Sequence, residues 1–278
     1  MKVNREKCSY SVLMPVYYKD NPKWLKESIE SILLQSIKPS EFIIVKDGKL
    51  TSELENVIEY YENKYKGLFY IRGFEENIGL GKVLAFGVNE CSNEYILRMD
   101  ADDYSLPDRC EKQLSILENN KDIDVVGSNV IEFTDNINNI ISFVNLPEKN
   151  SDIIKYAKKR CPIRHPAIMY RKSKVLESGN YRDYRHAQDY NLVVHMIING
   201  CKFYNIQEYL TYMRVNKDFY KRRGGFNQLK IVMTLKKEFL DYGFYSIKDF
   251  IISASGNAFV CLMPNAIRKF IYKNLLRR

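Results

Sequence analysis

The first half of the chain alternates short runs of apolar, often β-branched residues with longer stretches in which apolar residues recur three or four positions apart. Runs of the first kind are typical of buried strands, and stretches of the second kind are typical of amphipathic helices. Strands that alternate with helices build parallel βαβ units, so the pattern predicts an α/β fold. The strands expected in this half are 11–16, 41–45, 68–71, 95–99 and 124–126.

Helix-start signals lie between these strands. Asn21 and Pro22 supply an N-cap and a first-turn proline, and apolar residues at helical spacing follow them. Ser52 opens a Ser-Glu-Leu-Glu sequence that reads as a capping box before the next helix. We therefore expect one helix after each of the first two strands.

The second half is a mixture of strand and helix patterns. A hairpin is expected over 130–144 around an Asn-rich turn at 136–139, and a strand is expected at 167–171. A helix over 188–199 is expected to stop at Gly200, because glycine is the usual residue at a helix C-terminus. Two strands, 202–206 and 209–215, and a helix near 226–242 complete the prediction.

Composition narrows the class of protein. The chain has 278 residues, of which 45% are hydrophobic and 28% charged, and it contains no repeated or low-complexity segment. These values exclude disordered, fibrous and solenoid proteins. The six cysteines form no zinc-ligand spacing and no disulfide framework, so we expect reduced thiols in the cytoplasm. The N-terminus has no apolar signal-peptide core.

The net charge is confined to the end of the chain. Residues 221–278 carry the whole excess of +9, whereas the preceding residues are neutral in sum. The uncharged stretch 250–267 is long enough to be a marginal membrane span, but Pro264 and polar residues interrupt it and basic residues follow. We therefore expect a main domain at 1–225 and a basic amphipathic helical extension at 226–278, which attaches peripherally to an anionic membrane surface. The alternatives are an ordinary helix that closes the core and a nucleic-acid-binding tail, although no nucleic-acid module is present.

Candidate site residues, most of them polar, stand at or just after the ends of four predicted strands. Ligands of open α/β sheets bind beyond the carboxyl ends of the strands, so these residues are expected to converge at one edge. They are Pro15 and Tyr17 after the first strand, Asp47 after the second, Asn77, Gly79 and Lys82 after the third, and Asp100 and Asp102 after the fourth.

The acidic pair is the sharpest of these signals. Asp100 and Asp102 leave a strand two residues apart, so both carboxylates can turn toward one divalent cation that also binds phosphate oxygens. The alternative is a solvated acidic turn or an N-cap before a helix at Pro107. Asp122 and Asp124 have the same spacing but precede a strand, which places them at the wrong edge and makes them an internal control.

Other candidates are ambiguous when they are taken singly. The turn from Asn77 to Lys82 lacks the glycines of a dinucleotide fingerprint or a P-loop, so it is explained equally by close approach to a nucleotide and by turn chemistry. Asp189 opens a helix, where the helix dipole alone favours a carboxylate. Arg222 and Arg223 precede two glycines and form either a mobile clamp for a diphosphate or a solvated loop. His165, between Arg164 and a proline, is a candidate to line the same cleft.

Six separated motifs, taken together, give the chain a family resemblance. In order they are Ser-Val-Leu-Met-Pro-Val-Tyr, Val-Lys-Asp-Gly, Glu-Asn-Ile-Gly-Leu-Gly, Arg-Met-Asp-Ala-Asp-Asp, His-Pro-Ala-Ile-Met-Tyr-Arg-Lys and Gln-Asp-Tyr. Their order over 11–225 resembles that of family 2 glycosyltransferases, in particular the bacterial branch that builds O-antigen, capsule and exopolysaccharide. The resemblance implies a GT-A fold, a Rossmann-like mostly parallel sheet with flanking helices, and transfer of a sugar from a nucleotide-sugar with inversion.

The resemblance also implies roles for individual residues. Asp189 would be the catalytic base, and Asp102, with Asp100, would hold Mn²⁺ or Mg²⁺. His165 would lie on the acceptor side. The remaining residues would contact the donor: Pro15, Tyr17 and Asp47 at the base, Asp100 at the ribose, Arg98 at the strand end, Asn77, Gly79 and Lys82 at the border, and Arg222 and Arg223 at the diphosphate.

The chain departs from the family pattern in two places. Gln188 stands where the family usually has a glutamate before the base, and Lys46 and Lys49 flank the Asp47-Gly48 pair where many members have Asp and Ser. The resemblance implies transfer of a hexose, with galactose from UDP as the best choice, to a lipid-diphosphate-linked saccharide at the cytoplasmic face of the bacterial inner membrane. A catalytically inactive scaffold of a membrane assembly complex is the alternative.

Overall fold

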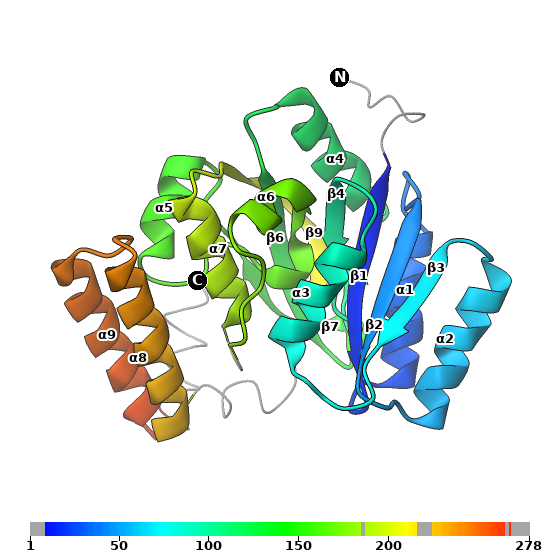
Figure 1. Cartoon of the computed structure of the whole chain (residues 1–278), viewed down its shortest axis with the longest axis horizontal. Coiled ribbons are helices and arrows are strands. Elements are labelled where there is room, and N and C mark those ends of the chain that lie inside the picture. Colours follow the sequence, from blue (N-terminus) through cyan, green and yellow to red (C-terminus); the bar gives the residue numbers. More distant parts are fainter. Residues whose placement is uncertain (1–8, 185–186, 216–223, 265–266, 268–278) are drawn as a thin grey trace.

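A mostly parallel sheet forms the centre of the protein (Figure 1). The computed structural model describes residues 9–184, 187–215, 224–264 and 267. The strands are β1 (Tyr10–Tyr17), β2 (Glu41–Asp47), β3 (Phe69–Gly73), β4 (Tyr95–Arg98), β5 (Tyr104–Ser105), β6 (Val125–Thr134), β7 (Asn136–Val144), β8 (Met169–Arg171) and β9 (Phe203–Arg214). Their order is β3-β2-β1-β4-β8-β6-β9-β5, with β7 on β6. The first four strands in this order are parallel, so their carboxyl ends share one edge.

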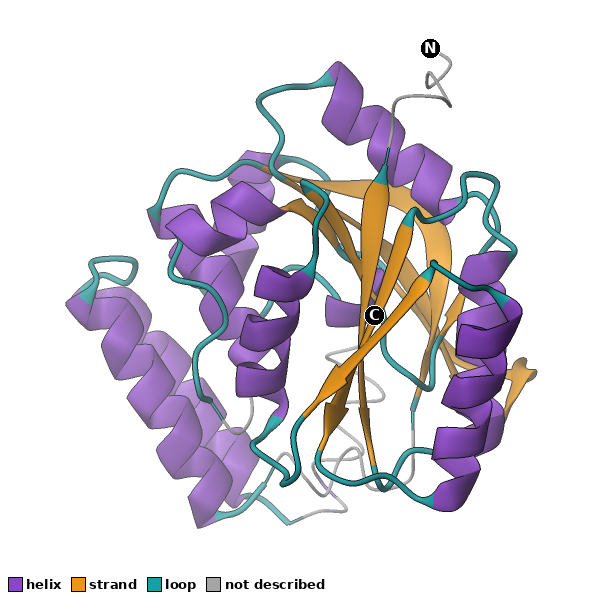
Figure 2. Ribbon diagram, turned by 45° about the vertical axis from the view of Figure 1, so that its right-hand side comes forward, coloured by secondary structure: helices purple, strands orange, loops and turns teal. Residues whose placement is uncertain are grey.

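Helices cover both faces of the sheet (Figure 2). The helices are α1 (Pro22–Leu33), α2 (Ser52–Lys64), α3 (Leu80–Glu90), α4 (Arg109–Asn119), α5 (Asn150–Ala157), α6 (Lys172–Glu177), α7 (Gln188–Ile198), α8 (Phe226–Asp241) and α9 (Ile247–Leu262). Val12 and Met14 of β1 belong to a hydrophobic cluster with residues of α1, α2 and α4, whereas Leu13 belongs to a second cluster with residues of α3, α5, α6 and α7. The strand is apolar throughout because it is buried on both faces. The predicted α/β class is therefore confirmed.

The two C-terminal helices form a hairpin that packs on α7 (Figure 1). Tyr190 and Val194 of α7 share a hydrophobic cluster with Leu235 and Phe239 of α8. The helix α9 ends at Leu262, one residue before the Met263-Pro264 pair, because proline cannot continue a helix. The hairpin thus forms an outer layer, and a separate hydrophobic cluster holds it against α7.

Several sequence predictions of element boundaries were wrong. The residues 124–126 and the first arm of the 130–144 hairpin form one strand, β6, which pairs with β8 at Val125 and with β7 from Val130. The hairpin turns at Asp135, whose φ is 45°, and the Asn-rich residues belong to β7. The predicted strands 202–206 and 209–215 also merge into one, β9, because register shifts beside Asn129 absorb the polar residues between them. The cap of α2 is Thr51, and Ser52 is already helical.

Candidate active site

The turn after β4 gathers three carboxylates at the carboxyl edge of the sheet. Ligand oxygens of Asp100, Asp102 and Asp103 all lie within 4.8 Å of one another. Asp122, the residue with the same spacing in the sequence, lies before β6 instead and pairs with Lys202 at 3.2 Å. The structure therefore places the two Asp-x-Asp sequences as expected, one at the site and one away from it.

Electrostatics in this turn favour a bound cation. Burial raises the pKa of Asp102 to about 7, and the neighbouring Asp100 adds to the rise, while Arg214 and Arg98 oppose it. Burial and the same two carboxylates raise the pKa of Asp103 well above its ordinary value. The Asp103 Oδ2 atom is buried and has no hydrogen-bond partner among the described residues. Carboxylate oxygens that lie close together with few hydrogen-bond donors are good ligands for a hard divalent cation. These residues therefore fit Mn²⁺ or Mg²⁺.

A fourth carboxyl group faces the same turn from the end of β1. Burial raises the pKa of Asp20 to about 7; a hydrogen bond from the Tyr17 backbone opposes this rise, and Asp102 and Asp100 add to it. The Asp20 Oδ2 atom accepts that hydrogen bond at 2.8 Å. The sequence analysis missed Asp20, although it follows the first strand by three residues and the rule on strand ends could have found it.

Asp100 is held from two sides. The Arg98 guanidinium, only 1% exposed, forms an ion pair with the Asp100 carboxylate. The Ser28 hydroxyl of α1 donates to the Asp100 carbonyl oxygen at 2.8 Å. The Arg98 Nε and one terminal nitrogen have no hydrogen-bond partner among the described residues. The predicted support of the strand end by Arg98 thus takes the form of a direct contact with Asp100.

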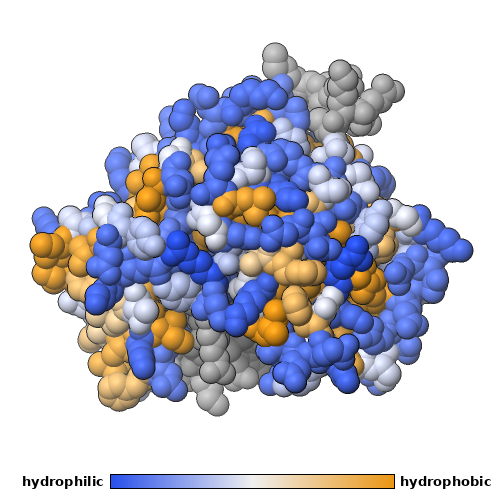
Figure 3. All heavy atoms as spheres, viewed as in Figure 1, coloured by the Kyte–Doolittle hydropathy of each residue, from blue (hydrophilic) through white to orange (hydrophobic). Residues whose placement is uncertain are grey.

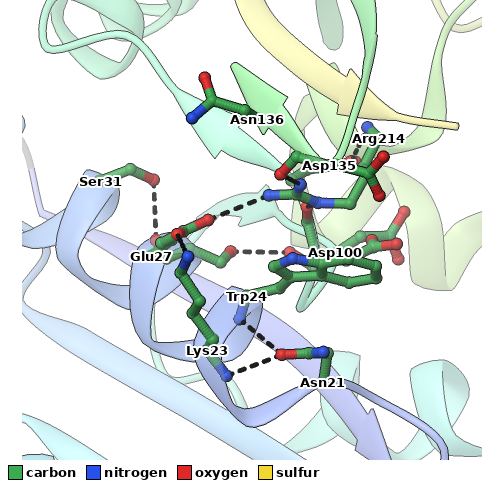
Figure 4. Close-up of polar contacts among 12 residues, drawn as sticks. Asn21, Lys23, Trp24, Glu27, Ser31, Asp100, Asp135, Asn136 and Arg214 are labelled. Carbon is green, nitrogen blue, oxygen red and sulfur yellow. Dashed lines mark hydrogen bonds and ion pairs between the residues drawn. The ribbon is translucent and has the colours of Figure 1, made fainter. Parts of the chain in front are cut away.

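Arg214, at the end of β9, connects the acidic turn to neighbouring parts of the same edge of the sheet (Figure 4). Its Nε donates to the Asp102 carbonyl oxygen at 2.8 Å, and its backbone N–H donates to Asp103 at 2.6 Å. The guanidinium lies between the rings of Trp24 and Phe133, 4.3 and 4.4 Å from their centroids. A terminal nitrogen pairs with Glu27 of α1 at 3.0 Å. Sequence reasoning missed Arg214, because a long-range contact from a strand end carries no local signal.

The turn after β3 is built around Asp47. Its Oδ1 accepts from the backbone of Ile78 and Gly79 at 2.7 and 3.2 Å, and its Oδ2 accepts from the Asn77 amide at 2.9 Å. Gly48 has a φ of +85°, and a Cβ there would lie 2.8 Å from the Asn77 nitrogen. The loop therefore needs glycine at this position. Asp47, Asn77 and Gly79 come together as the sequence predicted.

Three further donor-side candidates lie along the same edge of the sheet. Pro15 is buried within β1, and Tyr17, at the end of that strand, is 38% exposed. Lys82 of α3 forms an ion pair with Asp183 at 2.9 Å, and both side chains are more than half exposed. Because the pair faces solvent, it is weak and leaves the lysine able to exchange partners. Arg222 and Arg223 lie outside the described residues.

Asp189 and His165 both lie close to Tyr181, which connects them to the site. Asp189 lies in the first turn of α7, and no other described residue forms a hydrogen bond or ion pair with its carboxylate. Burial raises the pKa of the Tyr181 phenol, and Asp189 and Asp100 are both close enough to raise it further. His165 Nε2 lies 2.8 Å from the Tyr181 hydroxyl. Burial and the nearby Arg98 lower the pKa of His165 well below its ordinary value, so the ring is neutral at pH 7.

Comparisons with known proteins show the family to which the chain belongs. The family model of Glycosyl transferase family 2 matches residues 11–179. The chain belongs to this family. A relative from Escherichia coli, UDP-Gal:alpha-D-GlcNAc-diphosphoundecaprenol beta-1,3-galactosyltransferase, is 37% identical over 271 residues, which are 97% of each chain. The amylovoran biosynthesis glycosyltransferase AmsE of Erwinia amylovora is 33% identical over 80% of this chain and 82% of its own.

A solved structure confirms the GT-A fold. The crystal structure of S. aureus TarS residues 1–349 in complex with UDP-GlcNAc superposes with a TM-score of 0.68. The match covers 95% of this chain and 75% of the other at 18% identity. At this level of identity the likeness concerns the fold, and it confirms the GT-A architecture that the resemblance in the sequence implied.

Proposed function

We propose that the protein transfers a hexose, with galactose as the favoured sugar, from a UDP-sugar to a hydroxyl of a lipid-diphosphate-linked saccharide in bacterial surface polysaccharide biosynthesis. The observation that carries this proposal is the carboxylate cluster of Asp100, Asp102 and Asp103, which shares an edge of the sheet with the Asp47 turn. The choice of UDP-galactose and of the lipid-linked acceptor is supported by the galactosyltransferase relative, which matches nearly the whole chain.

The donor lies, in this proposal, across the carboxyl ends of β1, β2 and β4. Pro15, Tyr17 and Asp47 contact the nucleotide base, Asp100 faces the ribose, and Asn77, Gly79 and Lys82 border the donor. Asp102 with Asp100 holds Mn²⁺ or Mg²⁺, which when bound supplies positive charge to the departing diphosphate. Arg222 and Arg223 add positive charge to the same group.

Asp189 acts as the general base. Its carboxylate accepts the proton of an acceptor hydroxyl that His165 helps to place, while the hydroxyl oxygen forms a bond to the anomeric carbon. The bond between that carbon and the diphosphate oxygen breaks, and UDP leaves from the opposite side. Attack opposite the leaving group inverts the configuration of the sugar. The neutral Gln188 places no second negative charge beside the base.

Attachment to the cytoplasmic face of the inner membrane completes the proposal. Apolar side chains gather over α8 and α9 (Figure 3). Ile247, Ile251 and Phe259 form a stripe along one face of α9 and are 72, 57 and 67% exposed. Within the described part of the chain, no helix has the length and apolar character to cross a bilayer. The stripe and the +9 charge of residues 221–278 support binding to an anionic lipid surface.

The test of this function is UDP release from UDP-galactose with a short-chain GlcNAc-diphospholipid and Mn²⁺. We expect Asp102→Ala to abolish release, while Asp122→Ala, the control with the same spacing, keeps it near the wild-type rate. Asp189→Asn should lower turnover by about two to four orders of magnitude and keep donor binding, because an amide cannot accept the proton. Equal loss of UDP release in Asp102→Ala and Asp122→Ala at unchanged folding would contradict the proposal. So would a wild-type chain that is inactive with every UDP-sugar. Either result would favour a scaffold.

A further inference from the structure

One carboxylate of the C-terminal hairpin accepts hydrogen bonds from two other parts of the chain. Glu238 of α8 accepts from Arg182 at 2.6 Å and from the Tyr184 hydroxyl, both in the segment before α7. It also accepts from Asn191 at 3.1 Å and from His195 at 2.7 Å, both within α7. The Glu238 side chain is only 15% exposed. Such a concentration of donors on one half-buried carboxylate fixes the relative position of the groups that surround it.

The protonation states of this cluster are consistent with its hydrogen bonds. Burial raises the pKa of Glu238, but hydrogen bonds from Tyr184, His195 and Asn191 outweigh it and leave the pKa below its ordinary value. Burial lowers the pKa of His195, although Glu238 opposes that change. The imidazole is therefore neutral at pH 7 and its Nε2–H donates to an ionised carboxylate.

The two parts joined by Glu238 both reach the active site. Asn191 lies two residues after Asp189, in the same first turns of α7. In the other part, Asp183 stands between the two donors and pairs with Lys82 on the donor side. Glu238 thus connects the helix that carries the proposed base with a segment that contacts the donor-binding helix α3.

The backbone before α7 needs such support. Ala187, the N-cap residue, has a φ of 72°, in the left-handed region that residues with a Cβ seldom adopt. A strained conformation of this kind persists when surrounding contacts over-determine it. Its side chain makes no cap hydrogen bond, so the start of α7 is held by tertiary contacts rather than by its own cap.

We propose that Glu238 is a positioning residue for catalysis, which holds the first turns of α7 and with them the Asp189 carboxylate in place for the reaction. This inference rests on the proposed role of Asp189 as the base. Glu238 touches neither substrate nor reacting atoms in this account. A displacement of about 1 Å in a catalytic group lowers a rate by roughly 100-fold, so a lost anchor acts mainly on turnover.

The test compares two carboxylates that anchor the same hairpin. Glu238→Gln replaces one acceptor oxygen with an amide donor that faces other donors. Asp249→Asn, the control, weakens the 2.7 Å ion pair of α9 with Lys158 near α5 and does not touch α7. For Glu238→Gln we expect kcat with UDP-galactose to fall about 10- to 100-fold with KM for the donor within about threefold. We also expect faster amide hydrogen exchange over residues 187–198, and for Asp249→Asn neither change.

Two outcomes overturn the inference. One is wild-type kcat and exchange in Glu238→Gln, and the other is a parallel fall of kcat in both variants with equal losses of melting temperature, which marks a general structural role. A wild-type chain that releases no UDP from any UDP-sugar would refute the proposed function instead. In that case only the amide hydrogen exchange measurement tests the inference, and unchanged exchange over residues 187–198 in Glu238→Gln would refute the positioning role.

Discussion

At the scale of single residues, the site depends on which end of a strand a side chain occupies. Asp102 and Asp122 lie in similar acidic sequences, but only Asp102 follows a strand whose carboxyl end lies at the site's edge of the sheet. That difference can be predicted from the sequence because it needs only the direction of a strand. The partners Arg214 and Glu238 could not be predicted, since each is more than 40 positions from a residue that it binds.

Lys236 offers a test of the hairpin's interior. This lysine is 1% exposed, and burial lowers its pKa from 10.5 to about 8. Between these pH values the unfolded chain binds more protons than the folded chain, so stability should rise with pH in this window. At pH 7 the folded protein carries the full cost of the buried charge, on the order of 3 kcal/mol before its contacts with Ser253 and the Tyr245 ring offset part of it.

Lys236→Met should therefore be more stable than wild type at pH 7, with the difference shrinking toward pH 10.5. Urea unfolding at pH 7 and near pH 10 measures this. The neighbouring Lys237 is exposed, so Lys237→Met is the matched control and should change stability little at either pH. The same stability difference between wild type and Lys236→Met at both pH values would contradict the burial of a charged lysine.

At the scale of elements, the sequence predicted which segments are helix or strand better than where they begin and end. The helix expected over 188–199 is α7, and it stops before Gly200, whose φ is +80°. The boundaries within β6 and β9 were wrong because both strands change partners or register along their length. Such changes depend on neighbouring strands, which a local pattern of apolar residues does not contain.

The stripe on α9 is the element that the membrane proposal depends on. Replacing Ile247, Ile251 and Phe259 together with serine should lower affinity for vesicles that contain phosphatidylglycerol by about 10- to 100-fold. Each large apolar side chain contributes roughly 1.5 to 3 kcal/mol when fully buried, and only part of it enters the interface. Vesicle flotation measures the bound fraction.

The control removes apolar surface elsewhere. Ile140→Ser with Ile141→Ser on β7, where these residues are 46 and 39% exposed, should leave binding unchanged. Salt at about 1 M, where the screening length is roughly 3 Å, should release part of the wild-type protein. Failure of the wild-type chain to float, or equal flotation of the α9 variant, would count against a membrane-facing hairpin.

At the scale of the whole molecule, the sheet brings together residues that are far apart in the sequence. Parallel pairing of β1, β2, β3 and β4 places Tyr17, Asp47 and Asp100 at one edge, and α7 contributes Asp189. The family motifs predicted the GT-A fold, which the family match and the TarS superposition confirm. The roles that the motifs imply for this set of residues stay predictions. The contact between the hairpin and α7 through Glu238 could not be predicted from the motifs, because they end before α8.

The most direct test of the central claim is the structure of the product formed from UDP-galactose and a short-chain GlcNAc-diphospholipid. The donor carries its sugar in the α configuration, and attack opposite the departing UDP inverts that centre. Proton NMR of the purified product reads the configuration from the coupling constant of the anomeric proton. The account predicts one added galactose in β linkage, formed only when a divalent cation is present. An α-linked product, or no transfer from any UDP-sugar to this acceptor, would contradict it.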